Sequence, residues 1–592
     1  MSNYQYPYKD AVFILNHLLD FEKLCKQAEL DDINMELADA ILEEAARLGT
    51  EVFAPLNSVG DQQGAKLGEN GVEETPGFAD AYRQYAQSGW ASLAGAEQYG
   101  GQNMPKMLET AVTEIWDTAN LALALCPMLT TGAVDAITAH ASDELKDRYL
   151  PPMISGEWAG SMCLTEPGAG SDLAAVITKA VPEGDHYLIS GQKIFITWGD
   201  HQMTENIIHL VLARLPDAPA GVRGISLFLV PKFLLDDNGK PGQRNDAYCV
   251  GIEHKLGIHG SPTCTLNFGD NGGAVGYLVG KEHNGLMAMF TMMNEARQGV
   301  GMQALGVCER SYQQARTFAK ERIQGTRKDG SRYPIIEFPD VRRMLMLMKS
   351  ASEAMRALLY TAASEADRSH WAKNPEVAKK HTARNELYTP IVKGWCTELA
   401  QEITSFGVQI HGGMGYVEET GSAQHLRDAR ILTIYEGTTG IQGLDLAGRK
   451  ILLDKGEALQ SLLDEIQETA DAMAAVDNLS NMAESLTNTV NAAREAGKWL
   501  LENATEDKHA MGSSSVNLMM LLGFVCGGWV MGQSTLKATQ LLEAGPRDSA
   551  FLAAKQITAQ FYFEHFLPRS HSYLTTIKAG SDSMMGLSSE QF

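Results

Sequence analysis

A short stretch of the sequence places one carboxylate among small residues, where it could take a proton from a bound molecule. The stretch reads TIYEGTTGIQG, from Thr433 to Gly443, and puts Glu436 between Tyr435 and Gly437. Glycine-rich stretches commonly bind ligands through backbone N–H groups. A carboxylate beside them is either a favourable charge at a helix N-terminus or a general base. Taken alone, this stretch leaves both roles of Glu436 open.

A second stretch has the composition of a loop that closely approaches a ligand. It reads MCLTEPGAGSD and covers residues 162–172. Gly168 and Gly170 have no side chain, so the backbone there can come close to a flat or anionic group. Thr165 and Ser171 add hydroxyl groups that donate and accept hydrogen bonds. A plain turn before a strand would have the same composition, so this loop alone does not decide for a binding role.

Two further stretches of interest have an ordinary structural meaning when each is taken alone. GQKIFIT, residues 191–197, is on its own a strand with Phe195 and Thr197 on one face. QIHGGMGY, residues 409–416, is on its own the end of a helix. Neither stretch indicates chemistry unless the others accompany it.

The elements that carry these stretches change along the chain from helices to strands and back to helices. Apolar residues recur at helical spacing up to about residue 160, where Pro151 and Pro152 are expected to end a helix. Short β-rich runs between turn residues follow, and long helical patterns then return. The predicted fold class is therefore α+β, mainly α. Its parts are an N-terminal helical domain (1–160), a central β domain (161–282), a C-terminal four-helix domain (283–450) and an additional helical domain (451–592).

The charge of the chain argues against nucleic acid and anionic lipid as general partners. The 592 residues include 49 basic and 73 acidic side chains, which give a net charge of −24. Such a surface repels phosphate groups, so an anionic ligand would need local basic residues. No G-x-G-x-x-G follows a strand, and the chain has no P-loop, no H-E-x-x-H and no G-x-S-x-G. These motifs would have indicated a dinucleotide, nucleotide, metal or hydrolase site.

The cysteines and the apolar stretches indicate a cytoplasmic protein without a membrane span. Eight cysteines are scattered through the chain, with neither metal-ligand spacing nor a disulfide framework, so we expect reduced thiols and no metal site. The N-terminus lacks the order of regions of a signal peptide. The most apolar stretch, Leu518 to Gly532, is short for a span and is broken by glycines, so we expect a buried helix there.

Taken together and in order, seven motifs resemble those of the acyl-CoA dehydrogenase family of flavoproteins. They are GWASLAGAEQYGG, CLTEPGAGSD, GQKIFIT, NEARQGVGMQALG, ERIQG, QIHGGMGY and IYEGTTGIQ, and they extend over about residues 40–450. In this family two helical domains flank a small β domain, and FAD binds in an extended form without a Rossmann fingerprint. The resemblance therefore implies an FAD-dependent enzyme that desaturates an acyl-CoA thioester to the trans-2-enoyl-CoA.

The resemblance also implies a role for each small-residue stretch. The loop 162–171 would hold the flavin ring, and residues 195–197 would lie against the ring. Arg322 and the loop 409–413 would reach the FAD of a neighbouring subunit, and residues 438–440 would lie by the diphosphate. The residues implied to bind FAD are Met162, Cys163, Leu164, Thr165, Gly168, Gly170, Ser171, Phe195, Ile196, Thr197, Arg322, Gln409, Gly412, Gly413, Thr438, Thr439 and Gly440; those implied to bind substrate are Ser171, Asn294, Arg297 and Gly437.

The resemblance makes Glu436 the catalytic base. Desaturation removes a proton from Cα and a hydride from Cβ, and the hydride passes to the flavin. A carboxylate in a dry pocket is a strong base because desolvation disfavours its charged form. The thioester oxygen would accept hydrogen bonds from the base's own backbone N–H and a flavin ribityl hydroxyl, which acidifies the α-proton. Gly437 would leave room for the thioester.

Several positions depart from the family pattern. Some relatives carry the base on the helix that here reads NEARQG, where the matching residue is Ala296 and Glu295 is one place off. One residue is a rotation of about 100° on a helix, so we expect Glu295 to point away. Asn294 replaces a common aspartate, and Gly440 stands where a glutamine is common. We assign no role to Phe338 or Pro339, which replace a His-Gln pair that often touches FAD.

The segment 451–592 and the electron acceptor leave the finer function open. Longer family members with such an extension include bacterial enzymes for 3-(methylthio)propanoyl-CoA and others for medium or long fatty acyl-CoA. The resemblance implies electron-transferring flavoprotein as partner and, because the extension would cover the surface that joins two dimers, a homodimer. An acyl-CoA oxidase that uses oxygen is one alternative. A non-catalytic flavoprotein that serves in binding or assembly is another, although the acidic surface and the intact Glu436 disfavour it.

Overall fold

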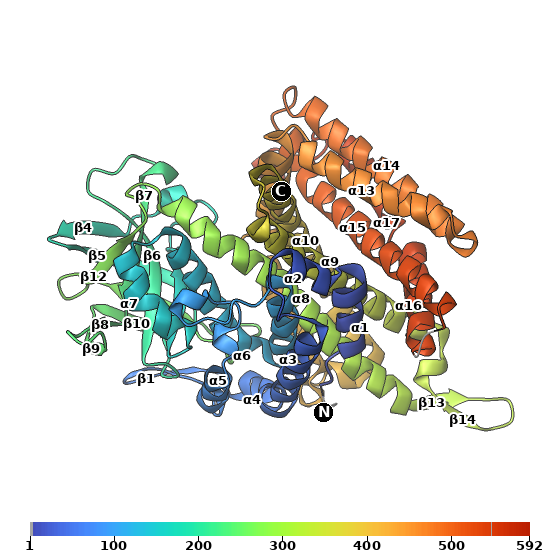
Figure 1. The fold of residues 1–592 in the computed structure, drawn as a ribbon, viewed down its shortest axis with the longest axis horizontal. Coiled ribbons are helices and arrows are strands. Elements are labelled where there is room, and N and C mark those ends of the chain that lie inside the picture. The colour runs from blue at the N-terminus through green and yellow to red at the C-terminus, as the bar shows by residue number, and fades with distance from the viewer. Residues whose placement is uncertain (1–3, 546–547) are drawn as a thin grey trace. The chain divides into compact units, whose positions relative to one another are not determined.

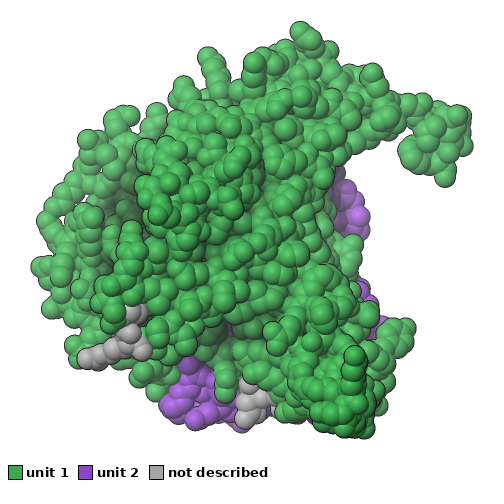
Figure 2. Space-filling model, turned by 90° about the vertical axis from the view of Figure 1, so that its right-hand side faces the viewer, with its two compact units in different colours: residues 1–44, 106–114, 300–592 green, residues 45–105, 115–299 purple. Residues whose placement is uncertain are grey.

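The computed structural model describes residues 4–545 and 548–592, and their packing divides them into two compact units. Unit 1 comprises residues 1–44, 106–114 and 300–592, and unit 2 comprises residues 45–105 and 115–299 (Figure 2). The predicted α+β, mainly α, fold class is confirmed. The four-part division of the sequence follows the succession of its elements rather than their packing, and it stays a prediction.

Unit 2 is built on one eight-stranded sheet. Seven strands run in the order β10-β11-β5-β12-β7-β6-β3, and β4 pairs with β5 and β6. Most neighbours are antiparallel, but β3 and β6 are parallel. The strands are β3 (Trp158–Cys163), β4 (Lys179–Glu183), β5 (His186–Thr197), β6 (Asn206–Arg214), β7 (Ile225–Pro231), β10 (Ala247–Ile252), β11 (Thr263–Phe268) and β12 (Ala274–Val279).

Helices and short hairpins complete unit 2. Three helices, α3 (Met35–Leu48), α6 and α8, contribute residues to both units. The helices are α4 (Ala54–Gln63), α5 (Phe78–Gln87), α6 (Lys106–His140), α7 (Asp143–Ile154) and α8 (Gly285–Glu321); the hairpins are β1 (Lys66–Gly68) with β2 (Gly71–Glu73), and β8 (Phe233–Leu235) with β9 (Pro241–Arg244).

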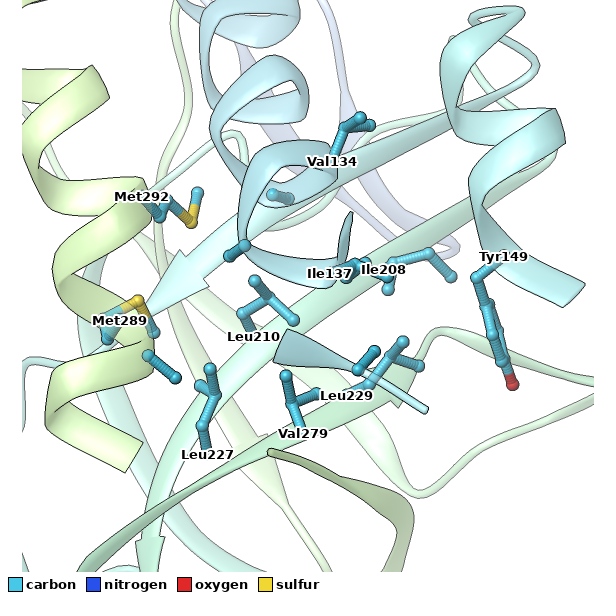
Figure 3. Packing of buried hydrophobic residues seen from close by; sticks show 14 of the residues in the cluster. Val134, Ile137, Tyr149, Ile208, Leu210, Leu227, Leu229, Val279, Met289 and Met292 are labelled. Carbon is cyan, nitrogen blue, oxygen red and sulfur yellow. The ribbon is translucent and has the colours of Figure 1, made fainter. Parts of the chain in front are cut away.

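The central strands of the sheet are buried on both faces. Leu210 of β6 and Leu229 of β7 belong to a core with Ile137 of α6, Tyr149 of α7 and Met292 of α8 (Figure 3). The alternate residues of the same strands form a second core on the other face. Burial on both faces explains why β6 and β7 read as nearly continuous apolar runs instead of alternating apolar and polar residues.

Unit 1 is almost entirely helical. Its last helices fall in the segment predicted to be an additional domain, and among them α13, α14 and α15 lie side by side (Figure 1). The helices of unit 1 are α1 (Tyr8–Phe13), α2 (Phe21–Gln27), α3 (Met35–Leu48, mostly), α9 (Pro339–Trp371), α10 (Pro375–His411), α11 (Ser422–Ala429), α12 (Thr439–Leu444), α13 (Glu457–Ala474), α14 (Ser480–Asn503), α15 (Ala510–Glu543), α16 (Ser549–His565) and α17 (Arg569–Lys578); one hairpin pairs β13 (Ile323–Thr326) with β14 (Arg332–Pro334).

A buried charge network ties distant parts of unit 1 together. The guanidinium of Arg356 on α9 lies 2.6 Å from Asp10 of α1, 2.8 Å from Glu114 of α6 and 2.9 Å from Glu309 of α8. Lys555 of α16 lies 2.7 Å from Asp10 as well. Burial alone would raise the pKa of Asp10, but Lys555 and Arg356 outweigh it and lower that pKa to about 2. Asp10 is therefore ionised near neutral pH.

Glycines let α15 pack closely on α10. A Cβ atom at Gly394 of α10 would lie 2.1 Å from the sulfur of Met519, and one at Gly523 of α15 would lie 2.2 Å from the ring of Trp395. The apolar stretch expected to form a buried helix, 518–532, lies in α15 and is buried throughout. By length and composition, α6 and α15 could each cross a membrane, but 72% and 89% of their most apolar windows are buried in the protein.

One expected helix boundary was wrong. Pro151 and Pro152 do not end α7, which continues to Ile154. A proline removes its own N–H donor but keeps its carbonyl, and the carbonyl of Pro151 accepts from the N–H of Ser155 at 3.0 Å. The two prolines remove the bonds that their own N–H groups would donate to the preceding turn, but they leave the carbonyls that close the last turn.

Gly523→Ala is expected to destabilise unit 1, because the new Cβ would meet the rigid indole of Trp395. Overpacking of this kind typically costs ~1–3 kcal/mol, which urea unfolding would show as a lower midpoint at an unchanged slope. Gly512→Ala on the same helix is the control, since a Cβ at that position would meet nothing within 4 Å. That substitution should keep or raise the stability, by up to about 1 kcal/mol. Equal midpoints for the two variants would contradict a close α10–α15 contact.

Candidate active site

The loop 162–171 leaves β3 of unit 2 and presents unpaired backbone donors at the surface. The N–H of Glu166 donates to the carbonyl of Ala169 and the reverse bond is also made, both at 3.0 Å, which closes the loop. Gly168, Gly170 and Ser171 are exposed. In the described part of the chain their N–H groups donate to no protein acceptor, and a Cβ at either glycine would meet nothing within 4 Å.

A buried ion pair holds this loop in shape. The carboxylate of Glu166 lies 2.7 Å from the ammonium of Lys193 of β5, and their side chains are 3% and 0% exposed. Lys193 also donates to the carbonyl of Leu164 at 3.0 Å, and Glu166 accepts from the hydroxyl and the N–H of Thr178. Burial would raise the pKa of Glu166, but Lys193 and these hydrogen bonds outweigh it and hold that pKa below its usual range.

Next to this loop, a β-bulge in β5 turns Phe195 outward. Lys193 and Ile196 pair with residues of β11 that lie only two positions apart, so the register shifts between them. Phe195 has a φ of 59°, in the left-handed region, and its side chain is 58% exposed. The strand alternation that would place Phe195 and Thr197 on one face is therefore interrupted. The N–H of Ile194 donates to the carbonyl of Thr165 at 2.9 Å and joins the bulge to the loop.

The loop and the bulge together fit a flat, polar cofactor. They offer exposed N–H donors, small residues that leave the backbone accessible, and an exposed phenyl ring. These groups suit an isoalloxazine ring with hydrogen-bonding edges. The donor set therefore fits the FAD that the motifs imply, and residues 162–171 and 195–197 are the ones that would hold its ring.

In unit 1, the stretch around Glu436 forms a strained turn rather than a helix cap. Glu436 has a φ of 54° and Gly437 a φ of 91°, so two consecutive residues lie in the left-handed region. A non-glycine residue there costs on the order of 1–3 kcal/mol. The cap of α12 is Thr438, whose hydroxyl accepts from the N–H of Ile441 at 3.3 Å. Glu436 is half-buried and is not the capping residue.

Two buried polar side chains contact the carbonyls of this turn. The ammonium of Lys393 on α10 donates to the carbonyl of Gly437 at 2.6 Å. The amide of Gln442 on α12 donates to the carbonyl of Glu436 at 3.0 Å and to that of Gly437 at 3.2 Å. Lys393 and Gln442 are both 0% exposed. The hydrogen bonds hold the backbone on the carboxyl side of Glu436.

The residues on either side of the turn are anchored as well. The hydroxyl of Tyr435 donates to the side-chain carbonyl of Gln303 on α8. The hydroxyl of Thr439 donates to the carboxylate of Glu398 on α10. Because Gln303 lies in the part of α8 that belongs to unit 1, all of these anchors come from unit 1.

The residues expected to reach a neighbouring subunit are exposed. Arg322, Gln409, Gly412 and Gly413 all lie at the surface of unit 1, where α10 ends at His411. Close to them in the chain, Met414, Tyr416 and Val417 are 52%, 87% and 42% exposed. Exposed apolar side chains beside polar ones are typical of a protein–protein interface.

On α8, the residues near the expected CoA contacts lie in unit 2. Ala296 is 3% exposed and provides no carboxylate at the position where some relatives carry the base. Arg297 is 4% exposed, and its guanidinium lies over the ring of Phe290, 5.9 Å from the centroid. Asn294 and Glu295 are half-buried. The substrate roles of Asn294 and Arg297 stay predictions.

Sequence reasoning missed the buried side chains that support the two strained segments. Glu166 lies in the motif CLTEPGAGSD and Lys193 in the motif GQKIFIT, but the roles predicted for these motifs belong to other residues. Lys393 had one available signal, because it is the single charge in the apolar run TPIVKGWC, and a lone charge on a buried face needs a partner. Gln442 had no such signal.

Comparisons with known proteins agree with the motifs. The chain matches the models for the acyl-CoA dehydrogenase N-terminal domain at residues 38–157, middle domain at 161–271 and C-terminal domain at 283–451, and the model "acetyl-CoA dehydrogenase C-terminal like" at 462–588.

Individual relatives agree with these matches. The chain is 44% identical to 3-methylmercaptopropionyl-CoA dehydrogenase of Ruegeria pomeroyi over 98% of this chain and 99% of that protein. It is 36% identical to a butyryl-CoA dehydrogenase of Syntrophomonas wolfei over 100% and 99%. The structure of butyryl-CoA dehydrogenase from Megasphaera elsdenii superposes with a TM-score of 0.56 at 27% identity, and it covers 70% of this chain and 97% of its own.

Glu166→Gln is expected to weaken FAD binding, because it leaves the Lys193 ammonium buried without its carboxylate. Breaking a buried ion pair from one side typically costs ~3–5 kcal/mol. The pKa of Glu166 is lower in the folded protein than in the unfolded chain. The stability that the ionised Glu166 contributes is therefore complete above the ordinary glutamate pKa, and it is lost as pH falls through the folded-state pKa.

The advantage of the wild type over Glu166→Gln should therefore be largest near neutral pH and shrink in acid. Thermal unfolding and bound FAD, measured over that pH range, check this. Glu183→Gln on β4 is the control, because Glu183 is exposed. A loss of FAD that is the same at every pH and in both variants would argue against the role of this ion pair.

Proposed function

The chain belongs to the acyl-CoA dehydrogenase family of FAD-dependent oxidoreductases. On this premise we propose that the enzyme desaturates a short acyl-CoA thioester and that Glu436 is its catalytic base. The observation that carries the assignment is the Glu436–Gly437 turn. It holds a glutamate in the left-handed region, Thr438 serves as the cap in its place, and buried donors fix the backbone. Strained residues fixed in this way are concentrated at active sites.

The proposed mechanism divides the work between a base and a hydride acceptor. FAD, when bound, supplies the acceptor for the hydride that leaves Cβ of the substrate. The carboxylate of Glu436 removes the proton from Cα, and its own N–H donates to the thioester oxygen, where negative charge develops. Gly437 has no side chain, which leaves room for the thioester. The exposed N–H donors of Gly168, Gly170 and Ser171 would hold the flavin ring.

A short acyl group is the proposed substrate, with 3-(methylthio)propanoyl-CoA first. Support comes from two full-length relatives, whose names describe a 3-methylmercaptopropionyl-CoA and a butyryl-CoA dehydrogenase. Anaerobic reduction of the bound flavin by a panel of acyl-CoAs tests this. Bleaching should be fastest with 3-(methylthio)propanoyl-CoA or butyryl-CoA, and a clear preference for long chains would contradict it.

Electron-transferring flavoprotein is the proposed acceptor. The family resemblance supports it, and an oxidase that uses oxygen is the alternative. Stopped-flow reoxidation of the reduced enzyme separates the two, since a dehydrogenase should be reoxidised faster by electron-transferring flavoprotein than by air.

The eight cysteines are free thiols and support the cytoplasmic location that we propose.

Glu436→Gln keeps the shape of the side chain and removes the base. Loss of a general base typically costs ~10²–10⁴ in rate, so we expect flavin bleaching and exchange of the substrate α-proton with D₂O to collapse while FAD stays bound. Glu295→Gln is the control and should keep most of the activity. If Glu295→Gln were the variant that lost α-proton exchange, the assignment of the base would be wrong.

The protein is expected to be a homodimer in which the loop 409–413 completes the FAD site of its neighbour. Tyr416→Asp places a charge on the exposed apolar surface beside this loop and should give monomers with less bound FAD, as measured by light scattering and flavin absorbance. Ile557→Asp on α16, where the side chain is 61% exposed, is the control. A wild-type monomer with a full complement of FAD would contradict the shared site.

A further inference from the structure

The Glu436–Gly437 turn rests on two buried polar side chains to which the mechanism above gives no role. On the premise that Glu436 is the base, as proposed above, we propose that Lys393 and Gln442 are positioning residues, which we call the clamp. The clamp holds the two carbonyls of the turn and thereby fixes the direction in which the carboxylate of Glu436 points.

The contacts of the clamp converge on two consecutive carbonyls. Gly437 O accepts from Lys393 at 2.6 Å and from Gln442 at 3.2 Å, and Glu436 O accepts from Gln442 at 3.0 Å. Neither carbonyl lies in a helix or strand. A Cβ atom at residue 437 would lie 2.7 Å from the amide nitrogen of Gln442, so glycine is what lets this nitrogen reach the turn.

Gln442 shows that the clamp is not there for stability alone. Its amide nitrogen makes two hydrogen bonds, both to the turn, whereas in the described part of the chain its side-chain oxygen is buried and makes none. A buried acceptor without a donor lowers stability. An apolar side chain of similar size would avoid that cost but could not hold the turn.

Lys393 brings a charge to the same point from a rigid element. Its side chain is 0% exposed, and a buried ammonium is retained only where strong contacts compensate its lost hydration. The next two residues of α10, Gly394 and Trp395, pack closely against Met519 and Gly523 of α15. The backbone that carries Lys393 is therefore held by the packing of α10 against α15.

Holding these carbonyls controls the reacting groups of residue 436. The carbonyl of Glu436 and the N–H of Gly437 share one peptide plane, so fixing the oxygen fixes ψ of Glu436. The left-handed φ sets the backbone N–H of Glu436 relative to its bond from Cα to Cβ, and the fixed ψ sets both relative to the held carbonyls. The base and the donor for the thioester oxygen are then set together, as a near-attack geometry requires.

Gln442→Met separates positioning from stability. It keeps the volume of the side chain and removes both the donors to the turn and the unpaired oxygen. We expect urea stability and bound FAD at or above the wild-type values, while flavin reduction and α-proton exchange slow together by about 10-fold to 10²-fold at an unchanged KM. Gln401→Met is the matched control, because Gln401 also donates to two carbonyls but not to those of the turn. Its rates should equal those of the wild type.

Lys393→Met tests the second member of the clamp, with the exposed Lys379→Met on the same helix as control. Lys393→Met should lower kcat by a similar factor at an unchanged KM. If Lys393→Met fails to fold, Gln442→Met decides alone. Wild-type rates in Gln442→Met, or a rate that falls only in proportion to lost FAD or stability, would overturn the clamp.

Glu436→Gln, measured in parallel, shows which proposal has failed. If α-proton exchange is slow in Glu436→Gln but normal in Gln442→Met, the clamp proposal is wrong and Glu436 remains the base. If exchange is normal in Glu436→Gln, the assignment of the base is wrong, and the clamp proposal fails with it.

Discussion

The buried guanidinium of Arg356 joins helices of unit 1 that lie far apart in the chain. It contacts three carboxylates, from α1, α6 and α8, while Lys555 of α16 contacts one of the three. Elements from the beginning, the middle and the end of the chain thus meet at one buried point. Ion pairs of this kind add little net stability, but separating one leaves a buried charge without its partner, which is costly. The network therefore disfavours arrangements in which these helices are apart, and apolar packing supplies most of the free energy.

The loop and bulge around residues 162–171 and 195–197 and the turn of Glu436 are held in the same way, although they lie in different units. In each, a non-glycine residue has a left-handed backbone, namely Phe195 and Glu436. In each, a fully buried lysine donates to a nearby carbonyl: Lys193 to Leu164, and Lys393 to Gly437. An ammonium is a strong donor in a dry interior. Buried lysines thus hold in place the backbone that we propose to bind the flavin and the backbone that carries the proposed base.

The sequence was sufficient to predict the order of the elements, the α+β fold class and the family, because periodicity and the small-residue motifs are local properties. The supports of the site could not be predicted in the same way. Lys393 and Gly437 are far apart in the sequence, and a helical pattern tells which face is buried but not which carbonyl a buried lysine reaches. The bulge at Phe195 was missed for a similar reason, because it depends on pairing with β11.

The close contact between α10 and α15 has a consequence for the order in which this chain acquires activity. α10 ends at His411 and leaves the ribosome long before α15, which begins at Ala510. Until α15 has been synthesised, the face of α10 around Gly394 and Trp395 has no partner from that helix. During that time the part of α10 that carries Lys393 is not packed against α15, and the helix that contacts the turn of Glu436 is less rigid. A nascent chain therefore presents this turn without the packing of α15 on α10 until residues 510–543 have been synthesised.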